Sequence, residues 1–289
     1  MAHVNDSIKN IARQLTPVYP DIGVAQRIAQ QLLSQLTNLT YTQLLTTTNL
    51  ELSPQQLAML HTWIHDIVHL HKPVQYILKS VPFGELQIQV KSPILIPRPE
   101  TEEWVFKLIT TLQDTPLRIL DMCTGTGCIG LMLAHTFQQA HVLLTDINEQ
   151  ACQLAQQNAL SHNLTNTHII QSDCFDHIPS TPEYDLITAN PPYISAEEYT
   201  NLEPRVTQWE DKKALHAGNN GLALYEKIIY HAPHYLTTKG HLWLEIGHQQ
   251  APAVITLLRN AAFTHITPHK DMQGKQRAIS ARAPESSHP

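Results

Sequence analysis

The stretch Tyr184-Asp-Leu-Ile-Thr-Ala-Asn-Pro-Pro-Tyr-Ile194 decides the fold, because a buried strand ends abruptly within it. Residues 184–189 are mainly apolar or β-branched, a pattern that predicts a short buried strand. Pro191 and Pro192 have no N–H for a sheet ladder, and each favours extended backbone in the residue before it. We therefore expect Asn190 in a rigid turn at the carboxyl end of a strand, where open α/β sheets place their ligands.

The polar groups of this turn suit a planar –NH2 group. The side-chain oxygen of Asn190 and the backbone carbonyl of Pro191 are two acceptors, which match the two hydrogens of such a group. Tyr193 adds a flat ring that can stack on a planar substrate. The turn predicts a clamp for a carboxamide or a base amine, with Asn190, Pro191 and Tyr193 as catalytic residues and Pro192 as a further substrate contact. The alternative is a plain strand exit in which Asn190 is only a turn residue.

Composition narrows the class of protein. The chain has 289 residues, 42% of them hydrophobic, and a net charge of −6, so no general basic field draws it to nucleic acid or to an anionic membrane. The first ten residues lack the apolar core of a signal peptide, and no run is long enough to span a membrane. The four cysteines show no metal-ligand spacing. We expect a cytoplasmic monomer with reduced thiols and no metal.

We divide the chain into a helical domain at residues 1–80, a β-hairpin linker at residues 81–98 and a catalytic domain at residues 99–289. Helical spacing of apolar residues after Asp21, and a Ser53-Pro helix start, predict helices and no strand in the first domain. Such a domain either helps to select a partner or only supports the rest of the chain.

Alternating polar and apolar residues in the linker predict that Phe83–Val90 and Ile94–Pro97 form its hairpin. The linker leads into a helix that starts with Arg98, Glu100 and Glu102. These charged residues either form structural ion pairs or line the mouth of the site.

From residue 117 onward, predicted strands and helices alternate, which indicates a mostly parallel sheet with right-handed crossovers. The predicted strands are residues 117–121, 142–146, 168–173, 184–189, 241–247, 264–268 and 276–281. The predicted helices are residues 129–137, 148–161, 221–235 and 251–261.

A glycine-rich turn follows the first of these strands. Gly125-Thr-Gly-Cys-Ile-Gly130 matches G-x-G-x-x-G, and Asp146 ends the next strand, where it can accept two ribose hydroxyls. The alternative for Asp146 is a helix cap. A nicotinamide-dependent dehydrogenase shares this pattern, but the carboxylate of Asp121 fits poorly beside a pyrophosphate, and no hydride-transfer set stands out. S-adenosylmethionine, which has a ribose and an ammonium but no phosphate, suits an acid-lined turn better.

At this point the chain resembles the release factor glutamine methyltransferase family over most of its length. The resemblance is carried by the glycine turn, the ribose acid, Asn190-Pro-Pro-Tyr193 and further motifs. These motifs are Pro73-Val-Gln-Tyr-Ile-Leu78, Phe83-Gly84, Leu95-Ile-Pro-Arg-Pro-Glu-Thr-Glu102, Glu203-Pro-Arg205, Gly221-Leu222, Glu245-Ile-Gly247 and Asp271-x-x-Gly-x-x-Arg277. The block from Ile96 to Glu102 is the most specific of them.

The resemblance implies a seven-stranded Rossmann-like methyltransferase sheet with a small helical N-terminal domain. It also implies S-adenosylmethionine as cofactor and, as substrate, the Gln of the Gly-Gly-Gln motif in class I peptide chain release factors. The expected cofactor-binding residues are Asp121, Cys123, Thr124, Gly125, Thr126, Gly127, Asp146, Ile147, Asp173, Cys174 and Asn190. The alternatives are a ribosomal-protein glutamine methyltransferase, an adenine-N6 DNA methyltransferase, which would need a basic groove, and more distantly a dehydrogenase.

Three positions depart from the family pattern. Cys123 replaces the first Gly of the turn, so we expect no positive φ there. Lys79 stands where a Gly is common, and Cys174 stands where a large apolar residue often meets the adenine.

Overall fold

The computed structural model describes residues 2–112, 117–218 and 220–285, which form two compact units. The first comprises Met1–Ser80 together with Glu203–Trp209, and the second comprises Val81–Leu202 together with Glu210–Pro289. We call them the helical unit and the sheet unit.

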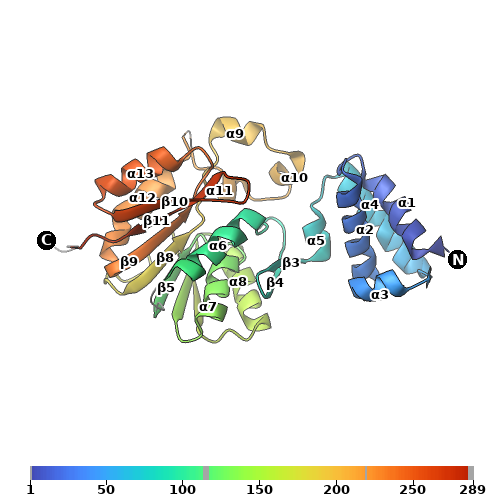
Figure 1. The fold of residues 1–289 in the computed structure, drawn as a ribbon, viewed down its shortest axis with the longest axis horizontal. Coiled ribbons are helices and arrows are strands. Elements are labelled where there is room, and N and C mark those ends of the chain that lie inside the picture. Colours follow the sequence, from blue (N-terminus) through green and yellow to red (C-terminus); the bar gives the residue numbers. More distant parts are fainter. Residues whose placement is uncertain (1, 113–116, 219, 286–289) are drawn as a thin grey trace. The chain divides into compact units, whose positions relative to one another are not determined.

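Helix caps and apolar stripes explain the helical unit. The side chain of Asp21 accepts a hydrogen bond from Val24 N, and Ser53 forms a capping box with Gln56, so two helices begin at the predicted residues. The elements are β1 (Ala2–His3), α1 (Val4–Leu15), α2 (Ile22–Thr37), α3 (Tyr41–Thr46), β2 (Asn49–Leu50), α4 (Pro54–His69) and α5 (Val74–Leu78) (Figure 1). The antiparallel pair of β1 and β2 corrects the expectation of no strand here; two residues on each side are too few to give an alternating pattern.

A distant segment completes the helical unit. Residues 203–209, which include the short helix α10 (Pro204–Thr207), belong to this unit although they follow the acceptor motif in the sequence. Trp209 Nε1 donates a 2.8 Å hydrogen bond to the carbonyl of Leu70, and the Lys72 ammonium lies 5.3 Å from the centre of the Trp209 ring. The chain therefore leaves the sheet unit after Leu202 and returns to it at Glu210.

The hairpin begins and ends earlier in the sequence than expected. β3 (Ser80–Phe83) pairs with β4 (Leu86–Gln89), and the turn between them contains Gly84 at φ +58°. The predicted strand at Ile94–Pro97 is wrong, because these residues have no strand structure. Pro93 and Pro97 lack the N–H groups that a strand would donate, which explains the difference.

The predicted seven-stranded, mostly parallel sheet is confirmed. Its order is β10-β11-β9-β8-β5-β6-β7, in which β9, β8, β5, β6 and β7 are parallel, whereas β11 is antiparallel to both of its neighbours. The strands are β5 (Arg118–Met122), β6 (His141–Asp146), β7 (Thr167–Gln171), β8 (Tyr184–Ala189), β9 (Leu236–Glu245), β10 (Thr264–Lys270) and β11 (Gln276–Arg282).

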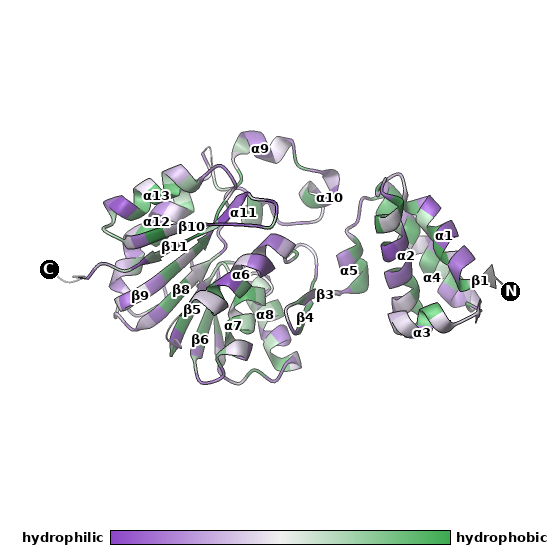
Figure 2. Cartoon of the chain, in the orientation of Figure 1, coloured by the Kyte–Doolittle hydropathy of each residue, from purple (hydrophilic) through white to green (hydrophobic). Residues whose placement is uncertain are grey.

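Helices cover both faces of the sheet, as Figure 1 shows, and Figure 2 shows the apolar character of the central strands between them. One group is α6 (Pro99–Thr111), α7 (Cys128–Thr136) and α8 (Glu149–Ser161), and the other is α12 (Ala223–His231) and α13 (Ala251–Asn260). The predicted helix at 221–235 ends earlier, and a 3-10 turn at Ala232–His234 contains Pro233, which cannot continue the hydrogen-bond ladder. The connection after β8 carries α9 (Ala196–Thr200), α10 and α11 (Lys212–Leu215). In the described ranges, no helix combines the length and apolar content needed to cross a membrane.

Candidate active site

Strand pairing brings two turns together at the carboxyl edge of the sheet. β5 and β8 are parallel neighbours in which Met122 pairs with Ala189. The residues that follow form the glycine turn (residues 123–127) and the acceptor turn (residues 190–193). Because β5 lies between β8 and β6, the glycine turn has the acceptor turn on one side and Asp146, the last residue of β6, on the other.

Left-handed backbone shapes the glycine turn. Cys123, Gly125 and Gly127 have φ angles of 55°, 56° and 86°. The expectation that Cys123 needs no positive φ is therefore wrong. The backbone turns at Cys123 immediately before Thr124 N, which donates a 3.0 Å hydrogen bond to Thr145 O at the end of the neighbouring strand β6. A left-handed residue other than Gly costs about 1–2 kcal/mol.

The two glycines have different surroundings. A Cβ atom added at Gly125 would meet nothing within 4 Å, so this part of the turn faces open space. A Cβ atom added at Gly127 would lie 2.9 Å from Leu131 Cδ1 and 3.1 Å from Ala155 Cβ, so Gly127 is needed for packing between the turn and the helices. Gly125 thus borders space for a ligand, whereas Gly127 supports α7 and α8.

Asp146 is both a cap and an available acceptor. Its Oδ2 accepts from Gly125 N and its Oδ1 from Asn148 N, each at 2.9 Å. Burial raises the pKa of this carboxyl, and the two backbone N–H bonds oppose that rise. Each oxygen of a carboxylate can accept a second hydrogen bond, so two ribose hydroxyls can still bind. Ile147, beside it, is 61% exposed and offers an apolar surface.

Asp121 connects the two turns. Its Oδ2 accepts from Thr124 Oγ1 at 2.5 Å and from Gly130 N at 3.0 Å, and its Oδ1 accepts from Thr188 Oγ1 at 2.8 Å. Burial raises the pKa of Asp121 to about 6, against the effect of these three donors. Thr188 lies on β8, two residues before the acceptor turn, so one buried carboxylate joins the glycine turn to the acceptor strand.

The end of β7 supplies the remaining expected cofactor residues. Asp173 is exposed, and its Oδ1 lies 3.0 Å from the Lys227 ammonium on α12. Cys174 is buried at φ 51°, and its carbonyl accepts a 2.9 Å hydrogen bond from Ser172 Oγ. Thr126, also buried, lies inside the glycine turn. Asp173 is thus the member of this group that presents a polar side chain to solvent.

The thiols do not supply a nucleophile. All four cysteines are free, and burial raises the pKa of Cys123 well above its ordinary value. Burial likewise raises the pKa of Cys128 and Cys174 to about 12 and that of Cys152 to about 11. Thiols with such pKa values are protonated at neutral pH and hence poorly nucleophilic. The described residues also contain no group of three or more His, Cys, Asp or Glu side chains that could hold a metal ion.

The acceptor turn keeps its two expected acceptors available. Asn190 is half-buried, and within the described residues neither its side-chain amide nor the Pro191 carbonyl has a hydrogen-bond partner. Tyr193 is half-buried, and burial raises the pKa of its hydroxyl, which is therefore neutral. The turn continues into Ile194, whose N–H donates to Leu215 O at 2.8 Å.

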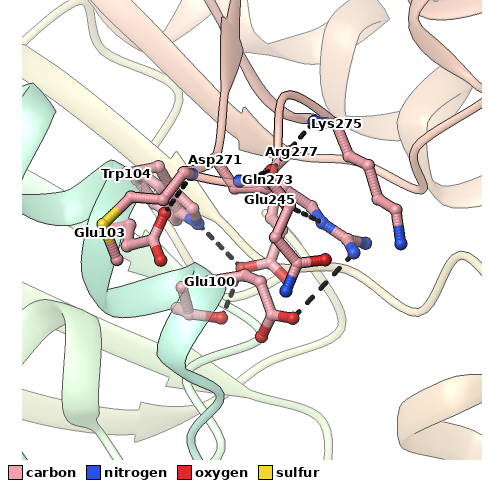
Figure 3. A network of polar contacts seen from close by, with 10 residues as sticks. Glu100, Glu103, Trp104, Glu245, Asp271, Gln273, Lys275 and Arg277 are labelled. Carbon is pink, nitrogen blue, oxygen red and sulfur yellow. Dashed lines mark hydrogen bonds and ion pairs between the residues drawn. The ribbon is translucent and has the colours of Figure 1, made fainter.

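The charged residues at the start of α6 mainly form structural contacts. Arg98 pairs with Glu210, whose side chain is buried, and Glu102 accepts a 2.7 Å hydrogen bond from Gly84 N. Glu100 lies 3.9 Å from the Arg277 guanidinium, and that guanidinium donates to Asp271 at 3.0 Å (Figure 3). Of the two alternatives for this block, ion pairing therefore accounts for Arg98.

Glu245 has a supporting role beside the acceptor turn. Its buried carboxylate accepts from Thr101 Oγ1 at 2.6 Å and from Trp104 Nε1 at 2.8 Å, which joins the end of β9 to α6 (Figure 3). Burial raises its pKa. Sequence reasoning missed Thr188, Gln250 and Glu210, whose contacts around the site span 57 to 112 residues of sequence, a separation that no local pattern covers.

Known proteins match both parts of the chain. Residues 106–207 match the family model described as Methyltransferase small domain, and residues 7–78 match the PrmC N-terminal domain. The Release factor glutamine methyltransferase of Lactococcus lactis is 38% identical over 234 residues, 80% of this chain and 85% of that protein. The protein of the same name from Coxiella burnetii is 31% identical over 286 residues, 98% of this chain and 99% of its own.

A sibling and a solved structure complete the comparison. The Ribosomal protein uL3 glutamine methyltransferase of Francisella tularensis is 32% identical over 209 residues, 71% of this chain and 66% of that protein. The crystal structure of a methyltransferase from Pyrococcus furiosus has a TM-score of 0.53 at 16% identity and covers 80% of this chain and 100% of that one, a likeness of fold. The chain is a methyltransferase and belongs to the family of release factor glutamine methyltransferases.

Proposed function

We propose that this protein transfers the methyl group of S-adenosylmethionine to the side-chain amide nitrogen (N5) of the Gln in the Gly-Gly-Gln motif of class I peptide chain release factors. The observation that carries the proposal is the acceptor turn: Asn190 and Pro191 present two carbonyl oxygens without partners in the described residues. A glutamine amide has the two N–H donors that such a pair can accept. Because release factors act in translation, we place the protein in the cytoplasm.

The residues of the glycine turn fit the cofactor. Asp146 has acceptor capacity left for two ribose hydroxyls, the space over Gly125 is open, and Ile147 offers an exposed apolar surface for a flat base. Asp121 can place negative charge near an ammonium group. When bound, S-adenosylmethionine supplies a methyl group that its sulfonium has already activated.

The acceptor turn then has to orient a weak nucleophile. The lone pair of an amide nitrogen is delocalised into its carbonyl, so alignment is the main task, and good alignment lowers a barrier by about 7–11 kcal/mol. Asn190 Oδ1 and the Pro191 carbonyl accept the two N–H bonds of the substrate, and these bonds strengthen as positive charge develops on the nitrogen. The Tyr193 ring forms a wall of the site. Its neutral hydroxyl is not a base, and the proton of the methylated nitrogen leaves to water.

A labelled methyl-transfer assay tests this function. The purified protein and labelled S-adenosylmethionine are offered a release factor, its Gly-Gly-Gln→Gly-Gly-Ala variant, ribosomal protein uL3 and duplex DNA. We expect label only in the intact release factor. Label in the variant factor would refute glutamine of that motif as the acceptor.

The other two substrates test the alternatives. The uL3 arm is included because a curated relative with that substrate in its name is 32% identical to this chain. Label in uL3 alone would mean that the protein methylates a glutamine, but that its substrate is the ribosomal protein and not a release factor. Label in DNA would instead make the amine of adenine the group that Asn190 holds.

A further inference from the structure

The acceptor turn is held from the far side by one glutamine. Gln250 precedes α13, and its Nε2 donates to the carbonyl of Tyr193 at 2.9 Å and lies 3.4 Å from the carbonyl of Gly221. Its Oε1 accepts from Gly247 N at 3.0 Å and lies 3.5 Å from the hydroxyl of Tyr225. The side-chain amide of Gln250 thus connects four groups around the end of the turn.

The backbone partners fix the direction of this amide. The N–H of Gly247 can only donate, and the carbonyls of Tyr193 and Gly221 can only accept. A flipped amide would bring its –NH2 group against the Gly247 N–H and its oxygen against two carbonyl oxygens. The –NH2 group of Gln250 must therefore point at the acceptor turn.

Two glycines make room for this contact. Gly221 has φ +70°, and a Cβ atom there would lie 2.3 Å from Tyr193 O and 2.6 Å from Gln250 Nε2. A Cβ atom at Gly247 would lie 2.9 Å from Gln250 Oε1. At Gly221 the clash with the backbone oxygen of Tyr193 and the positive φ exclude a side chain, whereas at Gly247 a side chain would displace the Gln250 amide. Both glycines therefore allow Gln250 to reach Tyr193.

Buried residues next to the Gln250 amide are themselves held by hydrogen bonds. Tyr225 is fully buried, and its hydroxyl donates to the carbonyl of Glu245 at 2.8 Å. The carboxylate of Glu245 is in turn held by two donors from α6. The position of Gln250 is thus set by the sheet unit itself, at the ends of β9 and α13.

We propose that Gln250 is a positioning residue for methyl transfer: it fixes the far end of the acceptor turn through the Tyr193 carbonyl, while β8 fixes the near end. The two carbonyl acceptors at Asn190 and Pro191 lie between these fixed points. The inference rests on the proposed function, since Gln250 is the residue that holds the same acceptor turn in place.

The sharpest test is the isosteric variant Gln250→Glu. It keeps an oxygen for the Gly247 N–H but replaces the –NH2 group by an oxygen that faces two carbonyls. We expect kcat/KM for the release factor to fall about 10–100-fold at pH 8, since the partly buried Tyr193 carbonyl loses its donor and faces a carboxylate oxygen. Once protonated, the introduced carboxyl group can donate one hydrogen bond, so activity relative to wild type should recover as the pH falls.

The control variant is Gln249→Glu, which makes the same charge change at the neighbouring, exposed residue. We expect it to match wild type at every pH. The titratable residues that contact the amide are Tyr193 and Tyr225, and the groups that act on their hydroxyls are Glu245, Arg277, Arg98, Glu100 and Cys123. Comparison with wild type at each pH removes the titration of these groups. The dissociation constant of S-adenosylmethionine should stay within about 2-fold in both variants, which also reports that they fold.

Hydrogen exchange gives a readout that does not need the substrate. Exchange of the backbone amides of Tyr193 and Ile194 should be faster in Gln250→Glu than in Gln249→Glu, whereas exchange in β8 should not change. Equal exchange together with equal kcat/KM would overturn the role of Gln250. If wild type itself methylates no release factor, the proposed function fails, and the exchange rates alone then decide whether Gln250 holds the turn.

Discussion

The two turns of the site are held by contacts of different range. The glycine turn is fixed by Asp121, Thr145, Asp146 and Asn158, all within about 35 residues of it and on its own strand, the neighbouring strand or the following helix α8. The acceptor turn is fixed by Gln250, 57 residues from Tyr193, and the chain that follows it passes through the helical unit. One half of the site is thus a local βα motif, and the other half depends on distant parts of the fold.

This difference predicts that the two halves can be damaged separately. Changes in the glycine turn should alter cofactor affinity, and changes around the acceptor turn should alter transfer to the release factor. A variant that changes cofactor affinity and the rate of methyl transfer to the same degree would show that the two turns do not act separately.

The largest effect is expected at the acceptor turn. Asn190→Ala removes one preorganised acceptor, and losing such a partner costs about 10²–10³ in kcat. Single-turnover kinetics measure the loss, and calorimetry should show little change in the dissociation constant of S-adenosylmethionine. Asn201→Ala, at an exposed asparagine after α9, is the matched control and should behave as wild type. Unchanged turnover in Asn190→Ala would refute the role of Asn190 in holding the substrate amide.

The next effect is expected in the glycine turn. Asp146→Ala removes the acceptor for the ribose, and hydrogen bonds to charged groups contribute about 1.5–3 kcal/mol, so the cofactor dissociation constant should rise about 10–100-fold. Asp185→Ala is a close control, because Asp185 also accepts from two backbone N–H groups, those of Leu117 and Arg118, but at the amino end of the strands. Asp185→Ala should lower stability and leave cofactor affinity unchanged. If both variants lose the same cofactor affinity, Asp146 acts only as a helix cap and does not bind the ribose.

A third prediction concerns the link between the halves. The pKa of Asp121 is about 6 in the folded protein and lower in the unfolded chain, so its contribution to stability falls as the pH rises from about 4 to 6. Thr188→Val removes a donor to the charged form and should raise this pKa further. The free energy of unfolding should drop by about 1.5–3 kcal/mol at pH 8, and the deficit should shrink as the pH falls from 8 toward 6, through the raised pKa of the variant, and be small at pH 5.

Denaturant unfolding at several pH values measures this deficit. Thr188→Ser keeps the hydroxyl and should recover most of the loss at pH 8. A deficit that is the same at pH 5 and pH 8 would mean that packing of the residue, and not its hydrogen bond to Asp121, accounts for the loss.

The contrast between the turns also explains what the sequence could predict. Periodicity and the G-x-G-x-x-G spacing place every strand of the sheet and the glycine turn, because these patterns extend over neighbouring residues. Gln250, Thr188 and the return of residues 203–209 to the helical unit are outside such patterns, since each depends on how distant elements pack. The left-handed backbone of Cys123 escapes prediction for another reason: positive φ is expected of glycine and asparagine, so a cysteine gives no sign of it.

The smallest effect is expected from weakening the contact that holds residues 203–209 in the helical unit. Trp209→Phe keeps a ring near Lys72 but removes the 2.8 Å hydrogen bond to Leu70 O, which contributes about 0.5–1.5 kcal/mol. Weaker attachment of residues 203–209 gives the chain after the acceptor turn more freedom. We therefore expect the KM for the release factor to rise about 2–10-fold with no change in cofactor affinity. Trp63→Phe is the control, because it alters the same helical unit outside this segment. Steady-state kinetics should show a smaller rise in KM for Trp63→Phe than for Trp209→Phe. Equal rises would mean that the effect of the helical unit on the substrate does not depend on residues 203–209.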